Sequence, residues 1–536
     1  MCGILGGNKF KNVEQVKSGL KSMMHRGVDN NTIVKFENGF YLAHNRLTIQ
    51  DISDDANQPM VSDDGRFHIV FNGELWKSSF DEHDHRLRAK YKFKTEKSDT
   101  ELLLYFLIDN IEDLETALND LEGMFVFALY DTEKEDLILG RDFVGRLPLY
   151  YHYDGEEIIF SSEVKGIQQS IGIPFYDRDF VKDLHRELIR LVKAGEIVYL
   201  KNDFLGTKMH VSRFFDFKPK PFDMNHPTGY YPNEEEFEEY DSEDLGMDYY
   251  VDGFRERLEF AVEDELISDY PLCTILSGGI DSTVITYLLA KHVPNLEAFV
   301  VSVKQERERK GDLHYARIAA EEFGIKLHEV IITKEDIEEY LPQAIWAVET
   351  DNWKQVSPAV AQLFLARAVA DKGYRVAFSG DGADEIFAAY GEVQQWMWHN
   401  PYWWHRKRVN LMNSLHKNNL IRCNKIMMYG GIVELRSPFM NREVVDFGLR
   451  IPTRHRDDKD GGGGIMKWVM RKSFEGQISE ELLMRKKKTF QVGCHSDFLK
   501  DQKDVIENHF KQLFVDCDVP SDYIRQFSTE IQEFSA

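Results

Sequence analysis

The second half of the chain alternates short apolar runs with longer segments that carry apolar residues every three or four positions. Four apolar runs have the length of buried strands: 272–276, 296–303, 326–333 and 375–379. Helical patterns fill the gaps between them: 282–292, 312–323, 335–348 and 358–372. Strands that alternate with helices are joined by crossovers and form a parallel sheet. We therefore predict an α/β domain in this half of the chain.

The first half of the chain has a different pattern of apolar and polar residues from the second half. Strand-like runs occur at 3–7, 41–51, 68–71, 124–130 and 136–141, and the last two form a hairpin-like pair. Asn72-Gly73-Glu74 has the composition of a turn that ends the third run. Ser98 stands where a cap would begin a helix over 102–108. Short strands with few helices predict a domain of another kind than the second half.

A break in composition separates the two halves near residues 217–248. Lys218-Pro219-Lys220-Pro221-Phe222 is rich in turn-forming residues, and 233–248 is strongly acidic. We interpret the break as a linker with a solvated surface excursion. A segment that binds a partner is the alternative. One face of a helix then follows, marked by Phe254, Leu258, Val262 and Leu266.

Composition and charge narrow the class of protein. A chain of 536 residues is longer than a single hydrophobic core usually holds, so two or three domains are expected. The net charge of −25 argues against broad binding to nucleic acid or anionic membranes, and no apolar run has membrane-spanning length. Five scattered cysteines without a C-x-x-C pair indicate neither a disulfide framework nor a zinc site. Because the first residues also lack a secretory pattern, a reducing cytoplasm is expected.

The loop at 276–283, Leu276-Ser277-Gly278-Gly279-Ile280-Asp281-Ser282-Thr283, follows a predicted strand and precedes a predicted helix. Its glycines let the backbone approach an anion, its hydroxyls donate hydrogen bonds, and the helix N-terminus favours negative charge. A carboxylate such as Asp281 fits beside phosphate if it holds a divalent cation that bridges to phosphate oxygens. The loop predicts nucleotide binding rather than a plain glycine turn, and it is no Walker A motif, because no lysine follows the glycines.

A second loop, Ser379-Gly380-Asp381-Gly382-Ala383-Asp384-Glu385, follows the end of another predicted strand. Ligands of parallel sheets bind outside the carboxyl ends of the strands. Three carboxylates among glycines suit a metal and a pyrophosphate better than they suit a surface turn. We expect the two loops to share one nucleotide site.

Cys2 directly follows the initiator methionine, which is generally removed before a small residue. The Cys2 thiol would then lie beside a free α-amino group with an unperturbed pKa of about 7.7–8.0. Such an amine can act as the general base for the thiol. A chance cysteine near a disordered terminus is the alternative, but the run at 3–7 indicates an ordered strand and turn.

The first half also contains a series of short motifs in a fixed order. They are Met1-Cys2-Gly3-Ile4, His25-Arg26-Gly27, Leu42-Ala43-His44-Asn45-Arg46-Leu47, Asn72-Gly73-Glu74, Ser98-Asp99-Thr100-Glu101, and the segments 123–131, 140–142, 148–151 and 162–165. Together they resemble the glutaminase domain of class II glutamine amidotransferases, over residues 2–205. The resemblance implies an α+β N-terminal-nucleophile sandwich, with antiparallel sheets between layers of helices.

The same resemblance implies a role for each matching residue. The Cys2 thiolate attacks the side-chain amide of glutamine, and Asn72 and Gly73 form the oxyanion hole. Arg46 pairs with the α-carboxylate of glutamine, and Asp99 holds its α-ammonium. These residue types suit a zwitterion, which needs one cation and one anion. The implied glutamine-binding residues are Arg46, Leu47, Ile49, Gln50, Asn72, Gly73, Glu74 and Asp99.

The second half resembles the synthetase domain of glutamine-dependent asparagine synthetases, within the ATP pyrophosphatase group. The matching segments are 277–282 and 379–385, with weaker support from 436–439, 467–471 and 485–490. The resemblance implies a parallel sheet of the adenine-nucleotide alpha-hydrolase type. The implied ATP-binding residues are Leu276, Ser277, Gly278, Gly279, Asp281, Ser282, Val301, Ser379 and Gly380.

Further roles follow from this second resemblance. Asp281 and Asp384 bind Mg²⁺, and Asp381 matches a carboxylate near the reacting groups. Lys487 matches a lysine that stabilises phosphate charge in the transition state. The neighbouring Lys486 and Lys488 are the alternatives for that role.

The chain is thus similar to the glutamine-hydrolysing asparagine synthetase family. The resemblance implies glutamine hydrolysis, transfer of ammonia, and adenylation and amidation of aspartate, with AMP and pyrophosphate as products. Residues 350–358 depart from the small, hydroxyl-rich segment that usually follows Glu349, and Asn441 stands where relatives often have Asp. Amidation of another carboxylate therefore remains the main alternative, ahead of an inactive interaction protein. Lactam-forming relatives lack the nucleophilic cysteine that is present here.

The expected domains are 2–205 for the glutaminase, 206–250 for a linker with an acidic excursion, and 251–536 for the synthetase. The expected ligands are glutamine, ATP, Mg²⁺ and aspartate or another carboxylate. We expect no nucleic-acid or membrane partner and a cytoplasmic location, and a homodimer is compatible with the resemblance.

Overall fold

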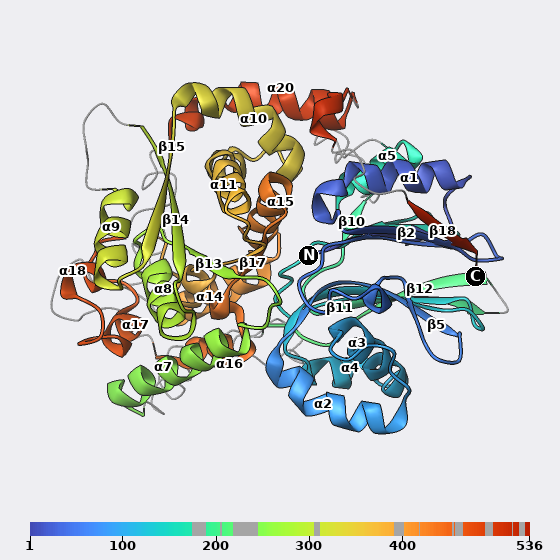
Figure 1. Cartoon of the computed structure of the whole chain (residues 1–536), viewed down its shortest axis with the longest axis horizontal. Coiled ribbons are helices and arrows are strands. Elements are labelled where there is room, and N and C mark those ends of the chain that lie inside the picture. Colours follow the sequence, from blue (N-terminus) through green and yellow to red (C-terminus); the bar gives the residue numbers. More distant parts are fainter. Residues whose placement is uncertain are drawn as a thin grey trace.

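The computed structural model describes residues 1–173, 189–203, 206–217, 245–304, 311–390, 401–417, 419–452, 455, 465–487, 497–516, 518–524 and 531–535. Its first half contains two stacked antiparallel sheets, and its second half contains one parallel sheet (Figure 1). This arrangement confirms the predicted fold class of an N-terminal-nucleophile sandwich followed by an α/β domain. Most of the predicted linker and its acidic segment, at 218–244, lies outside the described residues, as do Lys488, Cys494 and Cys517.

The first sheet has the strand order β10-β8-β9-β1-β3-β2-β18. Its strands are β1 (Gly3–Gly7), β2 (Asn30–Lys35), β3 (Tyr41–Arg46), β8 (Tyr150–Tyr153), β9 (Ile158–Ser161), β10 (Arg190–Leu191) and β18 (Gln532–Ser535). Strand β18 comes from the far end of the chain and pairs in parallel with β2. The first and last strands of the described chain therefore belong to the same sheet.

The second sheet has the order β12-β11-β7-β6-β5-β4. Its strands are β4 (Met60–Val61), β5 (Phe67–Leu75), β6 (Gly123–Asp131), β7 (Asp136–Arg141), β11 (Glu196–Asp203) and β12 (Gly206–Arg213). Helices cover the outer faces of the two sheets, so the domain has four layers (Figure 1). These helices are α1 (Val13–Ser22), α2 (Lys77–Lys90), α3 (Asp99–Asp109), α4 (Leu114–Ala117) and α5 (Val164–Ile171).

The predicted turn at Asn72-Gly73-Glu74 is wrong. These residues lie inside β5 and pair with Val126, Phe125 and Met124 of β6. A side chain at position 73 would meet the Met124 carbonyl oxygen at 2.1 Å, so glycine is needed for close approach of the strands rather than for a turn. The strand expected at 41–51 is also shorter, because β3 ends at Arg46 and the chain leaves the sheet there.

The third sheet is parallel throughout, with the order β15-β14-β13-β16-β17. Its strands are β13 (Leu272–Ile275), β14 (Glu297–Val303), β15 (Lys326–Ile332), β16 (Val376–Phe378) and β17 (Glu434–Arg436). Strand β17 has only three residues, which is too short for a pattern to predict. The order reverses between β13 and β16, which places a topological switch point there.

Helices bury both faces of this sheet, which explains the continuous apolar runs of its strands. The helices are α7 (Met247–Asp264), α8 (Ile280–His292), α9 (Asp312–Glu322), α10 (Lys334–Val348), α11 (Trp353–Asp371), α12 (Ala383–Ile386), α14 (Pro401–Leu415), α15 (Asn419–Gly431), α16 (Arg442–Arg450), α17 (Trp468–Ser473), α18 (Glu480–Leu483) and α20 (Lys503–Phe514). Helix α11 begins five residues before the predicted start, because Asn352 caps it.

Both ends of the segment predicted as a linker are regular. Strand β12 pairs with β11 along its whole length, so the second sheet continues to Arg213. Helix α7 begins at Met247 and buries Phe254, Leu258 and Val262, as the pattern predicted. In the part of the chain that the structure describes, every helix falls short of the length or the apolar character needed to cross a membrane.

Candidate functional site

A first candidate site surrounds Cys2, at the start of β1. The thiol is buried, and its sulfur accepts a hydrogen bond from the Leu47 N–H at 3.4 Å. The Cys2 N–H donates to Asn72 Oδ1 at 2.7 Å. Burial raises the pKa of the Cys2 thiol. A base is therefore needed to generate the thiolate at neutral pH.

Asn72 is fully buried on β5, and only the oxygen of its side-chain amide has a hydrogen-bond partner among the described residues. Its Oδ1 accepts the Cys2 N–H, which orients the Nδ2 group the other way. Among the described residues, Nδ2 has no hydrogen-bond partner. A buried donor without a partner costs free energy unless a ligand satisfies it. The Asn72 side chain is thus a ready donor beside the sulfur atom.

A small cavity opens next to this pair and brings together the glutamine-binding residues expected from the sequence. Its lining includes Cys2, Arg46, Leu47, Ile49, Gln50, Gly73, Glu74 and Asp99, to which the structure adds Met1, Ala56, Gln58, Phe71, Ser98 and Thr100. Asn72 lies directly behind this lining. The end of β3 at Arg46 is what releases residues 47–50 from the sheet and lets them reach the cavity.

One cation, Arg46, and two carboxyl groups, Glu74 and Asp99, are among the residues that line this cavity. The Arg46 guanidinium donates to the Ser53 carbonyl at 2.8 Å and to Asn57 Oδ1 at 2.6 Å. Burial raises the pKa of Asp99 to about 7, and burial with neighbouring carboxylates raises the pKa of Glu74 well above its usual range. The cavity therefore offers complementary charges to a zwitterion.

Glu434 is a neighbour of this site that sequence reasoning missed. It lies on β17 of the other domain, is fully buried, and contacts the Met1 amino group at 3.4 Å. Its charge is one of the causes that raise the pKa of Glu74 and Asp99. No local pattern signals it, because the fold brings it from a distant part of the sequence.

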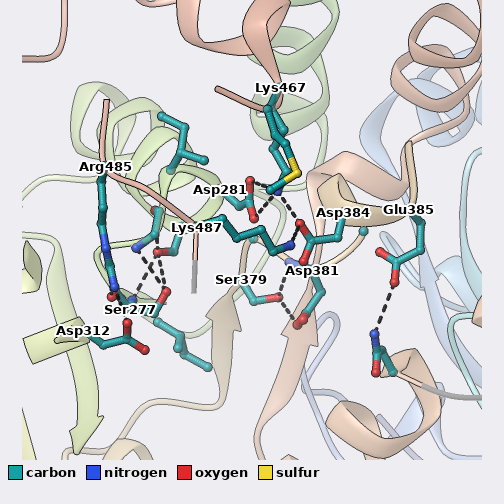
Figure 2. A pocket seen from close by; sticks show the side chains of 18 of the residues that line it. Ser277, Asp281, Asp312, Ser379, Asp381, Asp384, Glu385, Lys467, Arg485 and Lys487 are labelled. Atoms are coloured by element: carbon teal, nitrogen blue, oxygen red, sulfur yellow. Dashed lines mark hydrogen bonds and ion pairs between the residues drawn. The ribbon is translucent and has the colours of Figure 1, made fainter. Parts of the chain in front are cut away.

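A second candidate site lies at the switch point of the parallel sheet. The loops after β13 and β16 enclose a cavity of about 180 Å³ there (Figure 2). Its lining includes the predicted residues Ser277, Gly279, Asp281, Ser282, Ser379, Gly380, Asp381, Asp384 and Lys487. A side chain at position 380 would meet the Ser282 backbone nitrogen at 2.6 Å, so a glycine there lets the two loops touch.

Three predicted nucleotide-binding residues stay outside this lining. Leu276 and Val301 are buried in the core, on either side of the sheet. Gly278 has φ +67, and a side chain there would meet the Ala316 backbone nitrogen at 2.6 Å. Gly278 therefore lets the loop pack against helix α9.

Asp281 and Asp384 converge from the two loops on one cation, the Lys467 ammonium (Figure 2). Lys467 Nζ lies 2.5 Å from an oxygen of each carboxylate. Lys487 also contacts Asp384. Burial opposes ionisation of Asp384, but the two lysines outweigh it and lower its pKa to about 2. Both carboxylates and both ammonium groups thus face one point.

Lys467 was missed as a site residue, although it belongs to the weaker motif at 467–471. Its side chain is 1% exposed, and its backbone has φ +62, a strained conformation for a residue with a side chain. Arg485 and Asp312 were missed as well; they form an ion pair at the cavity wall, where Arg485 also donates to the Ser277 carbonyl at 3.0 Å.

The residues at this point fit a divalent cation held together with phosphate. Two carboxylates from two loops already share one positive charge, and carboxylate oxygens are the ligands that Mg²⁺ prefers. In the described part of the chain, no group of three or more His, Cys, Asp or Glu side chains surrounds a metal position. Magnesium usually keeps waters and substrate phosphates as its other ligands, so two carboxylates suffice.

The unusual stretch at 350–358 is largely remote from this cavity. Asn352 and Lys354 are exposed at the start of α11, and of that helix only Gln362 lines the cavity. Asn441 caps helix α16 by accepting the Glu443 N–H at 2.9 Å. Asn and Asp cap helices about equally well, so an exchange at position 441 preserves this role.

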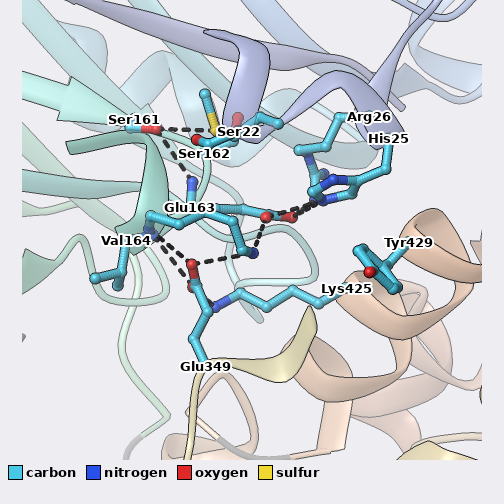
Figure 3. Close-up of polar contacts among 12 residues, drawn as sticks. Ser22, His25, Arg26, Ser161, Ser162, Glu163, Val164, Glu349, Lys425 and Tyr429 are labelled. Atoms are coloured by element: carbon cyan, nitrogen blue, oxygen red, sulfur yellow. Dashed lines mark hydrogen bonds and ion pairs between the residues drawn. The ribbon is translucent and has the colours of Figure 1, made fainter. Parts of the chain in front are cut away.

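Glu349 lies in a buried network between the two domains (Figure 3). It accepts the Lys165 N–H at 2.8 Å and contacts the Lys425 ammonium. Its neighbour Glu163 accepts hydrogen bonds from Arg26 at 2.8 Å and from the His25 ring at 3.0 Å. Burial opposes ionisation of Glu163, but its interactions with His25, Lys165 and Arg26 keep its pKa well below the usual range. The network thus ties the two domains together by paired charges.

Two protein families match different parts of the chain. Residues 1–199 match the family of glutamine amidotransferase domains, and residues 253–411 and 399–526 match the asparagine synthase family. The chain is 27% identical to asparagine synthetase B (glutamine-hydrolyzing) of Escherichia coli (strain K12), over 94% of this chain and 84% of that protein. It is 26% identical to a probable asparagine synthetase (glutamine-hydrolyzing) of Dictyostelium discoideum, over 95% of this chain and 87% of that protein.

Proposed function

Because the chain belongs to the asparagine synthase family, we propose that it is a glutamine-dependent amidotransferase that forms asparagine from aspartate. Glutamine is hydrolysed at Cys2, and ammonia passes internally to the second site. There ATP converts a carboxylate to an acyl-adenylate with release of pyrophosphate, and ammonia displaces AMP. The observation that carries this proposal is that one chain builds both the Cys2 cavity and the two-loop Asp281/Asp384 cavity.

In the first site, removal of Met1 would place a free α-amino group on Cys2. This amine takes the thiol proton, and the thiolate attacks the amide carbon of glutamine. The free Nδ2 of Asn72 and the Gly73 N–H then donate to the tetrahedral oxyanion. Arg46 binds the α-carboxylate and Asp99 the α-ammonium of glutamine. The presence of both a guanidinium and carboxyl groups in the cavity lining supports these roles.

In the second site, the loop at 277–282 binds the phosphates of ATP, with Ser379 and Gly380 beside it. Mg²⁺ held by Asp281 and Asp384 would neutralise phosphate charge. Lys467 and Lys487 add fixed positive charges where the pyrophosphate leaves. Asp381 also lines this cavity. In the proposed reaction it would lie close to the point where the carboxylate and the ammonia meet.

We propose further that the protein is cytoplasmic and that its chain is divided into a glutaminase unit and a synthetase unit. The runner-up function is the same chemistry on another carboxylate, because the stretch at 350–358 departs from the usual acceptor segment. A screen of aspartate and other carboxylates as acceptors distinguishes the proposed function from the runner-up. Amidation of aspartate with AMP and pyrophosphate as products supports the proposal, and activity confined to another carboxylate supports the runner-up. Release of ADP and phosphate would contradict adenylation in either case.

The pKa of Asp99 predicts an unusual pH dependence of glutamine use. Asp99 binds the α-ammonium only when ionised, and its pKa of about 7 means that this attraction is present above pH 7 and lost as the pH falls. The Cys2 amine must also be neutral, with an ordinary pKa of about 7.7–8.0. We expect log kcat/KM for glutamine to fall with a limiting slope of two below about pH 7, since kcat/KM reports the free enzyme.

The matched variant is Asp99→Asn, which cannot titrate at this position. Its kcat/KM for glutamine should be lower throughout, and its pH profile should retain only the slope of one that the amine causes. A slope of one in the unmodified enzyme would contradict the role of Asp99.

A further inference from the structure

A third cavity lies between the two domains and shares no lining residue with either site described above. Its volume is about 290 Å³, and its lining residues are Phe143, Ala194, Arg213, Phe215, Asp216, Phe217, Asn413 and His416. Asn413 and His416 come from the C-terminal end of helix α14, whereas the others lie at or just after the ends of strands β7, β10 and β12. A molecule in this cavity would therefore touch both domains.

His416 is the residue of this lining that points to a ligand. It is 3% exposed, and neither of its ring nitrogens has a hydrogen-bond partner among the described residues. Burial and nearby positive charges lower the pKa of His416 to about 2, so the ring is neutral and offers one donor and one acceptor. Buried polar groups without partners are costly unless a ligand or water satisfies them. His416 thus presents both kinds of hydrogen-bonding group to the cavity.

Three phenylalanines form the apolar part of the wall. The ring of Phe215 meets those of Phe143 and Phe217 edge to face, with centroids 5.2 Å and 4.9 Å apart. The Arg442 guanidinium packs over Phe143 at 4.6 Å and over Phe215 at 4.9 Å, and it pairs with Glu122 at 3.3 Å. These contacts hold the rings in place. An aromatic wall with a few polar groups is typical of a site for a small molecule, and aromatic faces favour a planar ring.

The charged groups around His416 carry a small excess of positive charge. The cations that act on its ring are Arg141, Lys417, Arg213 and Lys193. The carboxylates beside these cations are Asp216 and Glu196, which pair with Arg213 at 3.3 Å and 3.4 Å, and Asp142, which acts on Arg141. Four cations against three carboxylates leave one positive charge. The Arg213 side chain is 40% exposed, so an anion can reach it from solvent.

We propose that this interdomain cavity binds a small planar heteroaromatic anion. Its ring packs against the three phenylalanines, its polar ring atoms form hydrogen bonds with His416, and its single carboxylate or phosphate group lies against Arg213. The proposal does not depend on the adenylating function, because the cavity shares no residue with the Cys2 site or the nucleotide site. Such a ligand is an effector that contacts both domains rather than a substrate.

The test measures binding to the full-length protein by isothermal titration calorimetry with four probes. Orotate and uridine monophosphate each combine a heteroaromatic ring with an anion, as a carboxylate and as a phosphate respectively. Uracil lacks the anion, and ribose 5-phosphate lacks the ring. We expect orotate or uridine monophosphate to bind at least about tenfold more tightly than both incomplete probes, and the tighter of the two shows which anion the site takes.

Two variants locate the binding site. His416→Phe removes both ring nitrogens but keeps an aromatic ring, and Arg213→Gln removes the cation at the exposed side of the cavity. Each should weaken binding of the tighter probe by about tenfold or more. Unchanged thermal unfolding midpoints show that the variants fold.

Each variant has a matched control elsewhere in the chain. His83→Phe replaces a buried histidine of α2 that packs against Phe106 and whose Nε2 also has no partner among the described residues. Arg257→Gln replaces an arginine of α7 that pairs with Glu443 and packs over a phenylalanine ring. Both controls should bind the probe as the unmodified protein does.

Two results would overturn the proposal. If neither orotate nor uridine monophosphate binds more tightly than uracil and ribose 5-phosphate, the cavity holds only water, which then satisfies His416. If the tighter probe binds equally well to His416→Phe and Arg213→Gln, its site lies elsewhere. Loss of binding in these two variants but not in their controls supports the proposal.

Discussion

Replacement of Cys2 by alanine is expected to abolish glutamine use and to leave ammonia-dependent synthesis intact. Glutaminase activity should fall by about 10³-fold or more, as is usual when a nucleophile is removed. The second cavity is built entirely from residues beyond 270, so its geometry does not depend on the thiol. Pyrophosphate release with ammonium as the nitrogen source should therefore stay within about twofold of the unmodified enzyme.

The matched control is Cys273→Ala, which removes a buried thiol from β13 in the other domain. This variant should retain both activities. If Cys2→Ala lost glutamine-dependent and ammonia-dependent synthesis to the same extent, the two sites would not be separable, and the proposed division of labour would fail.

Replacement of Lys467 by methionine is expected to have the second large effect, at the other site. The ammonium lies between Asp281 and Asp384, so its loss leaves two partly buried carboxylates facing each other. It also removes the charge that we propose stabilises the leaving pyrophosphate. Acceptor-dependent pyrophosphate release should fall by about 10²–10³-fold, the range found for loss of one group that stabilises transition-state charge. Glutaminase activity should persist, which shows that the chain still folds.

Lys472→Met is the control for Lys467. It removes a lysine from helix α17, the short helix that Lys467 directly precedes, and the Lys472 ammonium pairs with Glu475 at the surface. Pyrophosphate release by this variant should be normal. Normal release by Lys467→Met would place Lys467 outside the adenylating site.

Much of the fold was predictable from the sequence because its signals are local. The parallel sheet follows from apolar runs such as 296–303, which are buried on both faces. The two nucleotide loops follow from glycines and carboxylates placed at the ends of such strands. Asn72-Gly73 was misinterpreted, because a glycine required by a neighbouring strand has the same composition as a turn.

The features that the sequence did not predict depend on contacts between distant parts of the chain. Such contacts leave no local pattern in the sequence. Glu434 reaches the Cys2 site from a three-residue strand of the other domain. Lys467 joins the two carboxylates through a strained backbone that its sequence motif does not announce. Which charged side chains are buried, and which partners they have, is known only from the folded structure.

The most direct test of the central claim follows the nitrogen atom. The enzyme is given glutamine labelled with ¹⁵N in its side-chain amide, aspartate, ATP and Mg²⁺, in the presence of excess unlabelled ammonium. If the two sites act in sequence within one chain, the amide of the product carries ¹⁵N, and AMP and pyrophosphate form in equal amounts with it. A product whose amide is unlabelled, or whose formation releases ADP and phosphate, would contradict the account.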